Sequence, residues 1–416
     1  MTGRRRAEGE GSIFPYRNGF AAYTWIRTPS GKRAKKWVYG KTRELVHEKW
    51  IKLQRQALDA PIPTSTPTLG EHLNYWLTSV VKPNLAPLTF QTYETFVRLY
   101  IEPHLGSKRL DRLDLRAVQS WINTIARACQ CCVQGKDAGR PATKQRCCAL
   151  GRCCHTTIST RTLSDIRACL RASLAHAVDA DLISKNVAIT VKLPKNRSRS
   201  TRRKAWTTDE ARRFLESARA DGDPLYPAYV LILVLGLRKG EVLGLIWKHV
   251  DLTAAELHVA LQLQRVGGEL LLRETKTEGS DGTLPLPQIC CTALQLRREQ
   301  QTEDRTAAGA AWHETGLAFS TRFGTPIEPR NFNRSWTTRC TKADVRTITV
   351  HDGRRSCGTL LADLDVHPRV AMQILRHAQF ALTMEIYTLA SPEATKEALK
   401  RLGSSLDGPT PDLDEL

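Results

Sequence analysis

The chain has 416 residues, enough for two or three domains with separate cores, and its net charge of +20 favours a polyanionic partner. A cationic membrane-surface protein is the competing interpretation. It is disfavoured because no long basic amphipathic helix or lipidation motif is found, and the longest apolar run, 228–237, is too short to span a bilayer. We therefore expect no membrane partner. The N-terminus lacks an apolar signal core, so we expect a cytoplasmic, nucleoid-associated protein.

Residues 12–39 predict a small three-stranded sheet with turns at Asn18-Gly19 and at 29–31, followed by a helix from Thr42. A basic sheet face of this kind can enter the major groove of DNA. The alternative is a small solubilising domain whose charges are only solvated. We expect residues 1–58 to bind DNA, through Arg27, Lys32, Arg33, Lys35 and Lys36.

A Pro-, Ser- and Thr-rich linker, 59–68, precedes a predicted all-helical domain, 69–191. Its helices are expected at 69–81, from Thr89 to an end by Pro103, at 114–128 and at 159–180. A second linker, 192–204, holds seven basic residues and no acid. It could be merely solvated, or it could lie across phosphates and release counterions. The residues expected to do so are Lys195, Arg197, Arg199, Arg202 and Arg203.

An unusual cysteine-rich insert, 128–155, interrupts the helical domain. Because the chain lacks a secretion signal, its twelve cysteines favour thiols or metal over disulfides. Seven of them lie in the insert, beside a histidine. The alternatives are a structural zinc site and a reduced, metal-free surface loop. The candidate zinc ligands are Cys129, Cys132, Cys147, Cys148, Cys153, Cys154 and His155.

Residues 205–402 predict a mixed α+β domain. Thr207 or Thr208 can cap its first helix, and 227–235 reads as a buried helix. Strands at 257–263, 270–275 and 282–286 predict a small antiparallel sheet. A helix with an exposed loop is expected over 297–316, and the acidic tail 403–416 is expected to be disordered.

The most informative stretch is 349–387. On a helix, His351 and Arg354 share a face because they are three residues apart. Pro368 suits the first turn of a second helix, which would deliver His377 near its end. A third short helix, about 382–389, would present Tyr387. These four side chains together predict a binding site for a phosphate oxyanion.

The order H-x-x-R, L-x-H and a tyrosine ten residues later resembles the C-terminal boxes of the tyrosine recombinases, or phage integrases. The stretch GLRKGEVLGLIWKHVD, 236–251, resembles the first arginine box of that family, with Arg238 and Glu241. Lys276 resembles the hairpin lysine. Two departures are Arg376, where the family usually has glycine, and the pair 389–390, where many members carry a further histidine.

The resemblance implies that Tyr387 attacks a DNA phosphodiester and forms a 3′-phosphotyrosyl link. Arg238 and Arg354 would stabilise the transition-state charge. With two guanidiniums in the role of a cation, no cofactor is required.

The remaining groups of the site have supporting roles in this resemblance. His351 is suited to accept the phenol proton, and His377 would donate a further hydrogen bond. Lys276 would protonate the leaving 5′ oxygen. Glu241 would hold the guanidinium of Arg238 in place.

The implied protein is multidomain and mainly α: an arm-type DNA-binding module of three strands and a helix, a helical core-binding domain, and a catalytic α+β domain with a small antiparallel sheet. Its expected partners are double-stranded DNA attachment sites and three further copies of itself in a tetramer. Whether a directionality factor joins them stays open. The alternatives are a type I topoisomerase, a catalytically silent DNA-binding regulator and a metal-dependent nuclease, the last disfavoured by the lack of a carboxylate cluster.

Overall fold

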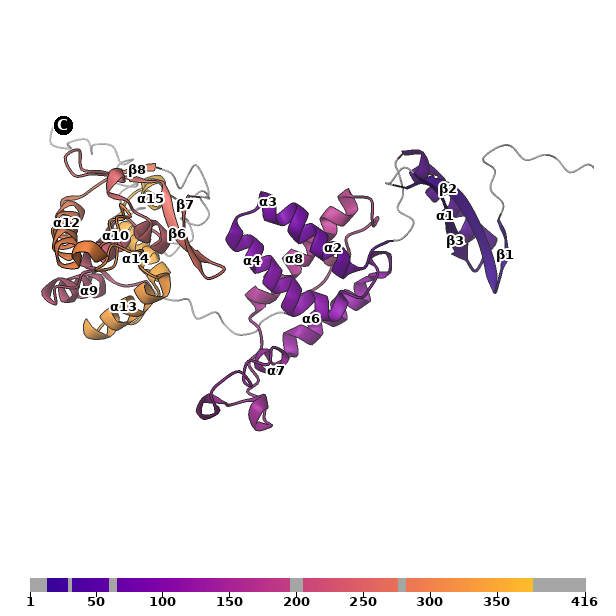
Figure 1. Ribbon diagram of the computed structural model, residues 1–416, viewed down its shortest axis with the longest axis horizontal. Helices are drawn as coiled ribbons and strands as arrows, with labels where there is room; N and C mark the ends of the chain where they lie inside the picture. The colour runs from indigo at the N-terminus through magenta and orange to yellow at the C-terminus, as the bar shows by residue number, and fades with distance from the viewer. Residues whose placement is uncertain (1–12, 29–31, 60–65, 195–204, 276–281, 377–416) are drawn as a thin grey trace, which may run out of the picture. The chain divides into compact units, whose positions relative to one another are not determined.

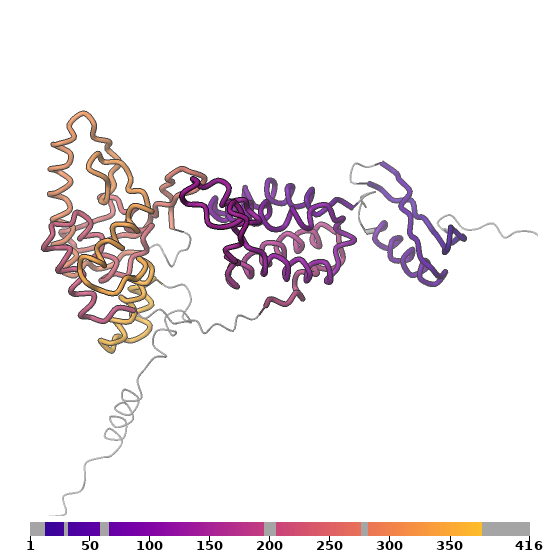
Figure 2. Tube along the Cα trace, turned by 90° about the horizontal axis from the view of Figure 1, so that it is seen from below, coloured from indigo at the N-terminus to yellow at the C-terminus, as the bar shows by residue number. Residues whose placement is uncertain are grey.

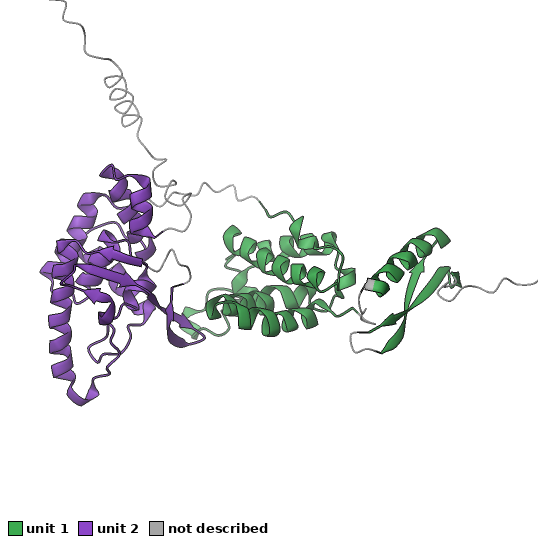
Figure 3. Cartoon of the chain, turned by 90° about the horizontal axis from the view of Figure 1, so that it is seen from above, with its two compact units in different colours: residues 1–198 green, residues 199–416 purple. Residues whose placement is uncertain are grey.

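The structure is a computed structural model that describes residues 13–28, 32–59, 66–194, 205–275 and 282–376. The chain divides into two compact units, 1–198 and 199–416, which Figure 3 colours separately. It is mainly helical with small antiparallel sheets, so the predicted fold class is confirmed. Within the described ranges, no helix has the length and apolar character needed to cross a bilayer.

The N-terminal part of unit 1 is an antiparallel sheet packed on one helix (Figure 1). Its strands β1 (Phe14–Tyr16), β2 (Gly19–Arg27) and β3 (Arg33–Gly40) pair in sequence order, and helix α1 spans Arg43–Asp59. Ala22 of β2 and Val38 of β3 are paired across the sheet, and both pack against Val46 and Trp50 of α1. The Thr42 hydroxyl accepts the N–H of Leu45, as expected for a helix start.

The rest of unit 1 is helical around a separate apolar core. Side chains at the positions before α2, α6 and α8 cap these helices. The elements are α2 (Leu69–Tyr75), a π-helical segment (Trp76–Val81), α3 (Lys82–Asn84), α4 (Pro87–Phe96), a second π-helical segment (Val97–Ile101), α5 (Glu102–Leu105), α6 (Leu115–Arg127) and α8 (Thr160–Asp179).

Two helix boundaries in this part differ from the sequence prediction. The first helical run continues beyond position 81 to Asn84, and the second begins at Pro87 and passes through Pro103 to Leu105. In the turn before Pro103, the N–H of Glu102 bonds to Val97 five residues back. A π-helical turn departs from the regular i to i−4 hydrogen-bond pattern. Pro103, which has no N–H to donate, can therefore lie within the helical run.

The cysteine-rich insert joins α6 to α8 and contains little regular structure. Its elements are the single turn α7 (Gln130–Val133) and the short 3-10 turns Ala142–Lys144 and Cys148–Leu150. Figure 1 shows it extending beyond the ends of α6 and α8. Its buried residues are few, two polar residues and two cysteines: Gln130, Asp137, Cys131 and Cys147.

Unit 2 is built around helix α10 (Tyr226–Val234), in which residues 226–233 are all buried. Trp206, Phe214 and Trp336 pack against it in a ring cluster. Helix α12 runs along one side of the unit (Figure 2). The other helices are α9 (Thr208–Ala220), α11 (Lys239–Leu243), α12 (Gln288–Ala308), α13 (Pro329–Lys342), α14 (Val350–Asp363) and α15 (Pro368–Leu375).

Three predictions for unit 2 need correction. The expected single sheet is two sheets, because the strand predicted over 257–263 breaks at Ala260. One sheet has the order β4-β5-β8 and the other is the hairpin β6-β7. Helix α12 begins nine residues before position 297, since its first turns are buried against α10, and α13 was not predicted. The strands are β4 (Val250–Asp251), β5 (Glu256–Val259), β6 (Leu261–Val266), β7 (Glu269–Glu274) and β8 (Gly282–Pro285).

Candidate active site

A sharp turn between α10 and α11 positions Arg238. Gly236 in this turn has a φ of +61°, and a Cβ there would lie 2.5 Å from Cδ2 of Leu375. The positive φ favours glycine, and any larger residue would also have to displace the buried Leu375 side chain. Arg238 then precedes the first residue of α11, its backbone N–H donates to Glu241 Oε2 at 2.8 Å, and its Nη1 donates to Oε1 at 2.6 Å. Glu241 therefore holds both the backbone and the side chain of Arg238.

Helix α14 carries the other two described members of the predicted site. Thr349 and Asp352 form a reciprocal cap that begins the helix at Val350. His351 consequently lies in the first turn, and Arg354 lies one turn later on the same face.

Arg354 is held in a fixed orientation although its side chain is almost fully buried. Its Nη1 donates to the carbonyl of Gly236 and its Nη2 to that of Leu375. Burial, and then the positive charge of Arg238, lowers the pKa of Arg354 to about 9. A guanidinium has five N–H donors, so two carbonyls can orient it while donors remain for a ligand. An anion that reached it would relieve the repulsion from Arg238.

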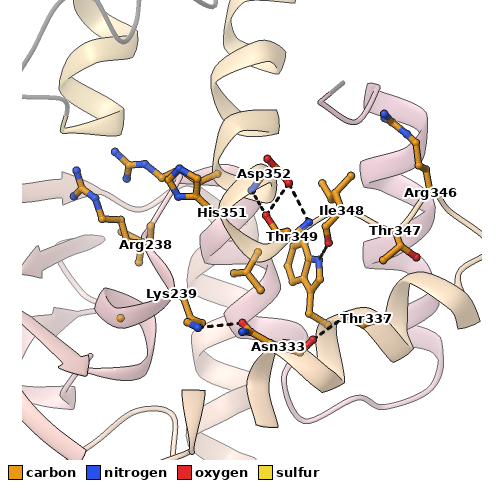
Figure 4. A pocket seen from close by; sticks show the side chains of 15 residues that line it. Arg238, Lys239, Asn333, Thr337, Arg346, Thr347, Ile348, Thr349, His351 and Asp352 are labelled. Carbon is orange, nitrogen blue, oxygen red and sulfur yellow. Dashed lines mark hydrogen bonds between the residues drawn. The ribbon is translucent and has the colours of Figure 1, made fainter. Parts of the chain in front are cut away.

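Arg238, His351 and Arg354 line one pocket of about 840 Å³. In Figure 4, the side chains of Arg238 and His351 lie toward the same end of it. The pocket also receives Lys239, whose Nζ donates to Asn333 Oδ1 at 3.1 Å. Desolvation lowers the pKa of Lys239. Lys239 lies within the stretch 236–251 that resembles the first arginine box. Its partner Asn333 lies in α13, far along the chain, so residue spacing could not reveal this contact.

The charge state of His351 is set by its neighbours. Partial desolvation and then the positive charge of Arg354 lower the pKa of His351, while the charge of Asp352 raises it. The net shift is downward, so the imidazole is predominantly neutral at pH 7. A neutral imidazole can accept a proton.

Arg376 occupies a second unusual backbone position. It ends α15 with a φ of 48° and a ψ of 52°, the left-handed conformation in which glycine is the common residue. Its buried Nη2 donates to Glu241 Oε2 at 2.5 Å. Burial lowers the pKa of Arg376, whereas the Glu241 carboxylate raises it. The sequence shows this residue only as a departure from a family pattern, and the structure shows what the side chain contacts.

Several predicted residues fall outside the described ranges. These are the catalytic candidates Lys276, His377 and Tyr387 with the helix expected at 382–389, the acidic tail, and the basic linker residues Lys195, Arg197, Arg199, Arg202 and Arg203. Among the described part of the predicted site, the structure brings together Arg238, Glu241, His351 and Arg354.

The basic residues of the N-terminal sheet do not all share a face. Paired positions place Lys35 opposite Trp25, and Arg33 opposite Arg27, on the exposed face. Lys35 Nζ lies 4.6 Å from the Tyr23 ring centroid. By the alternation of a strand, Lys36 belongs to the face that packs on α1. Lys32 is exposed just before β3. The structure therefore separates Lys36 from the other four.

The candidate zinc ligands are also divided. The sulfurs of Cys129, Cys132, Cys147 and Cys153 lie within 4.8 Å of one another and could hold a metal ion. Cys154 belongs to a second group, with Cys131 and Cys147. Cys148 and His155 are exposed and belong to neither group.

Comparison with known proteins identifies the family of the chain. Residues 204–393 match the phage integrase family, and residues 68–126 match the phage integrase N-terminal SAM-like domain. An integrase of Streptomyces ambofaciens is 28% identical over 408 residues, covering 92% of this chain and 93% of the relative. A protein named tyrosine recombinase XerC-like, from Caldanaerobacter subterraneus subsp. tengcongensis, is 25% identical over 397 residues, covering 90% and 93%.

Solved structures show the same fold. The Tn1549 transposon integrase in complex with a circular intermediate DNA has a TM-score of 0.63 at 19% identity, over 81% of this chain and 100% of that one. A lambda integrase dimer bound to a COC' core site has a TM-score of 0.50 at 15% identity, over 92% and 96%. The chain belongs to the phage integrase family and is a site-specific recombinase of the tyrosine class.

Proposed function

We propose that the chain cleaves and rejoins DNA strands at attachment sites of a mobile element, with Tyr387 as the nucleophile. The phenol oxygen attacks the scissile phosphorus, the P–O5′ bond breaks, and a 3′-phosphotyrosyl link and a free 5′ hydroxyl result. Attack by the 5′ hydroxyl of another strand reverses these bond changes and releases the tyrosine. The bond count is conserved, so no nucleotide is consumed.

The observation that carries this proposal is the pair of fixed guanidiniums, Arg238 and Arg354, in one pocket. Glu241 holds the first, and two backbone carbonyls hold the second. Groups held in place before the reaction can stabilise the extra negative charge of the transition state without reorganising. Their forked geometry matches two non-bridging phosphate oxygens.

The other roles follow from position and family pattern. His351 beside Arg238 accepts the proton of the Tyr387 phenol. His377 donates a hydrogen bond to the phosphate, and Lys276 protonates the 5′ oxygen as it leaves. The match to the phage integrase family spans these three undescribed positions, 276, 377 and 387, which supports the assignment. Zinc in the cysteine-rich insert is a separate proposal and has no part in this chemistry.

We further propose that each part of the chain has the role expected from the sequence. Residues 1–58 bind arm-type sites, 69–191 bind the core site, 205–402 carry out catalysis, and the basic linker at 192–204 neutralises phosphates between the last two. The exposed sheet face supports the first role because it combines cations with aromatic rings at Trp25 and Tyr23. Exchange of two duplexes requires four nucleophiles, so the active form is a tetramer on DNA. A directionality factor remains a further candidate partner.

The test is covalent capture of DNA. Incubation with a duplex that carries the attachment site should give an adduct stable to SDS. Tyr387→Phe should bind the same duplex and form none, while Tyr75→Phe, a change at an exposed position on α2, should form it normally. An adduct with Tyr387→Phe would show that the nucleophile lies elsewhere. Recombinant products would distinguish a recombinase from a topoisomerase, which rejoins the same strand.

A further inference from the structure

The cysteine-rich insert has an arrangement of sulfurs that the strand-transfer chemistry does not use. The Cys132 sulfur lies 3.4 Å from that of Cys147 and 3.9 Å from that of Cys153, and the Cys129 and Cys147 sulfurs are 3.9 Å apart. A zinc ion with Zn–S bonds of about 2.3 Å in tetrahedral geometry separates its sulfurs by about 3.8 Å. Disulfide sulfurs would be about 2.05 Å apart.

We infer that Cys129, Cys132, Cys147 and Cys153 bind one structural zinc ion as a tetrathiolate site. The first pair is a C-x-x-C spacing in which Cys129 precedes the turn α7 and Cys132 lies within it. The second pair comes from the other side of the insert. The ion joins the two sides.

Backbone N–H groups around these sulfurs fit thiolates. The N–H of Cys154 donates to the Cys147 sulfur at 3.1 Å, and that of His155 donates to the Cys153 sulfur at 3.3 Å. Such donors stabilise negative charge on sulfur. His155 therefore serves the site through its backbone, while its exposed side chain lies outside the sulfur group.

The backbone around Cys147 is held by a buried carboxylate. Asp137 Oδ2 accepts the N–H of Cys147 at 2.7 Å and that of Ala149 at 3.2 Å, and Oδ1 accepts the N–H of Arg146 at 3.0 Å. Arg140 Nη1 donates to the same carboxylate at 2.8 Å. This turn presents Cys147 toward the other three sulfurs.

The insert lacks the usual source of stability for a folded segment. Apart from its sulfurs, its buried side chains are the polar residues Gln130 and Asp137. Segments of this size without an apolar core usually depend on a metal or a disulfide. Four thiolates and one zinc ion carry a net charge of −2, which suits the insert's basic side chains: Lys136, Arg140, Lys144, Arg146 and Arg152.

Cys154 is the competing fourth ligand, and the geometry assigns it a different place. Its sulfur lies 3.7 Å from that of Cys129, but it belongs to the second sulfur group, with Cys131 and Cys147, and lies 3.2 Å from the hydroxyl of Thr156. Its own N–H already serves the Cys147 sulfur, a contact that a Ser replacement would keep. Replacement of Cys154 should therefore leave the zinc in place, whereas replacement of Cys153 should remove it.

The experiment measures zinc in the intact chain, purified under reducing conditions, by elemental analysis. One zinc per chain is expected. Cys132→Ser and Cys153→Ser should lose it, and the matched controls Cys148→Ser and Cys154→Ser should keep it. Cobalt substituted for zinc should show the absorption of a tetrahedral thiolate complex. No zinc, two zinc ions, or loss with Cys154→Ser but not with Cys153→Ser would overturn the assignment.

A second measurement on the unmodified chain guards against misfolded variants. Removal of zinc by a chelator should expose the loop between Cys132 and Cys147 to a protease, and added zinc should protect it again. Identical cleavage with and without the chelator would contradict a structural role. Covalent capture of DNA by Tyr387, followed in parallel, reports separately on the proposed recombinase activity.

Discussion

Arg376 and Glu241 are 135 positions apart in the chain, yet they form a buried ion pair with a 2.5 Å contact. Glu241 also binds Arg238, so one carboxylate is shared by two guanidiniums. Arg354 lies close enough for the charge of Arg376 to lower its pKa further. Arg376 thus adds a third cation behind the two that we assign to the phosphate, and Glu241 offsets the resulting repulsion.

The Arg376–Glu241 ion pair and the backbone conformation of Arg376 contribute separately to the free energy of unfolding. Two variants can separate these contributions. Arg376→Ala should lower the free energy of unfolding by at most roughly 3–5 kcal/mol, the cost of breaking a buried pair, because Glu241 keeps Arg238 as a partner. Arg376→Gly should be about 1 kcal/mol more stable than Arg376→Ala, since φ is 48° at this position. Urea unfolding measures both. An alanine variant as stable as the glycine variant would refute the backbone argument.

The proposed base predicts a pH dependence for cleavage. The pKa of His351 is lowered from its ordinary value of about 6.5, so the neutral form persists to lower pH. The rate of covalent adduct formation should therefore fall only at pH values below about 6.5. The positive charge of Arg355 contributes to the lowering, so Arg355→Gln should move this fall to higher pH. A shift to lower pH, or none, would contradict the role of His351.

The lowered pKa of His351 also makes the free energy of unfolding depend on pH. Below pH 6.5 the unfolded chain binds a proton at His351 more readily than the folded chain does. Stability should therefore be lost as the pH falls from 6.5 toward the folded pKa. His351→Gln should remove this part of the pH dependence, measured by urea unfolding at several pH values.

Lys276 as general acid predicts rescue by a better leaving group. Lys276→Ala should slow cleavage of ordinary DNA far more than cleavage of a substrate with sulfur at the 5′-bridging position. A thiolate leaves without protonation, so the defect should largely disappear. Single-turnover rates on the two substrates measure this. Equal defects would remove Lys276 from that role.

The two faces of the N-terminal sheet provide a matched pair of lysines. Lys35→Ala should weaken DNA binding and lower the slope of log Kobs against log salt by about one, as expected for one lost phosphate contact. Lys36→Ala should change neither, because strand alternation places it on the α1 side. Binding to a fluorescent duplex at several salt concentrations tests both. Equal effects would mean that the exposed face is not the DNA-binding face.

Short-range features of this protein could be predicted from the sequence. Thr349 and Asp352 are three residues apart, the spacing of a reciprocal cap, and helix α14 begins where they lie. The same local geometry places His351 and Arg354 on one face. The β1-β2-β3 order could be predicted because its turns are short. Local spacing determines these features, since the interacting groups are near neighbours in the chain.

Long-range contacts were decided only by the tertiary structure. The pairing of Glu241 with Arg376, the contact of Lys239 with Asn333 and the pairing of β5 with β8 all join segments far apart in sequence. The grouping of the sulfurs of Cys129, Cys132, Cys147 and Cys153 also depends on the folded insert, in which Asp137 holds the backbone of Cys147. Residue spacing does not encode such distances, because they arise when separately formed helices and turns pack together.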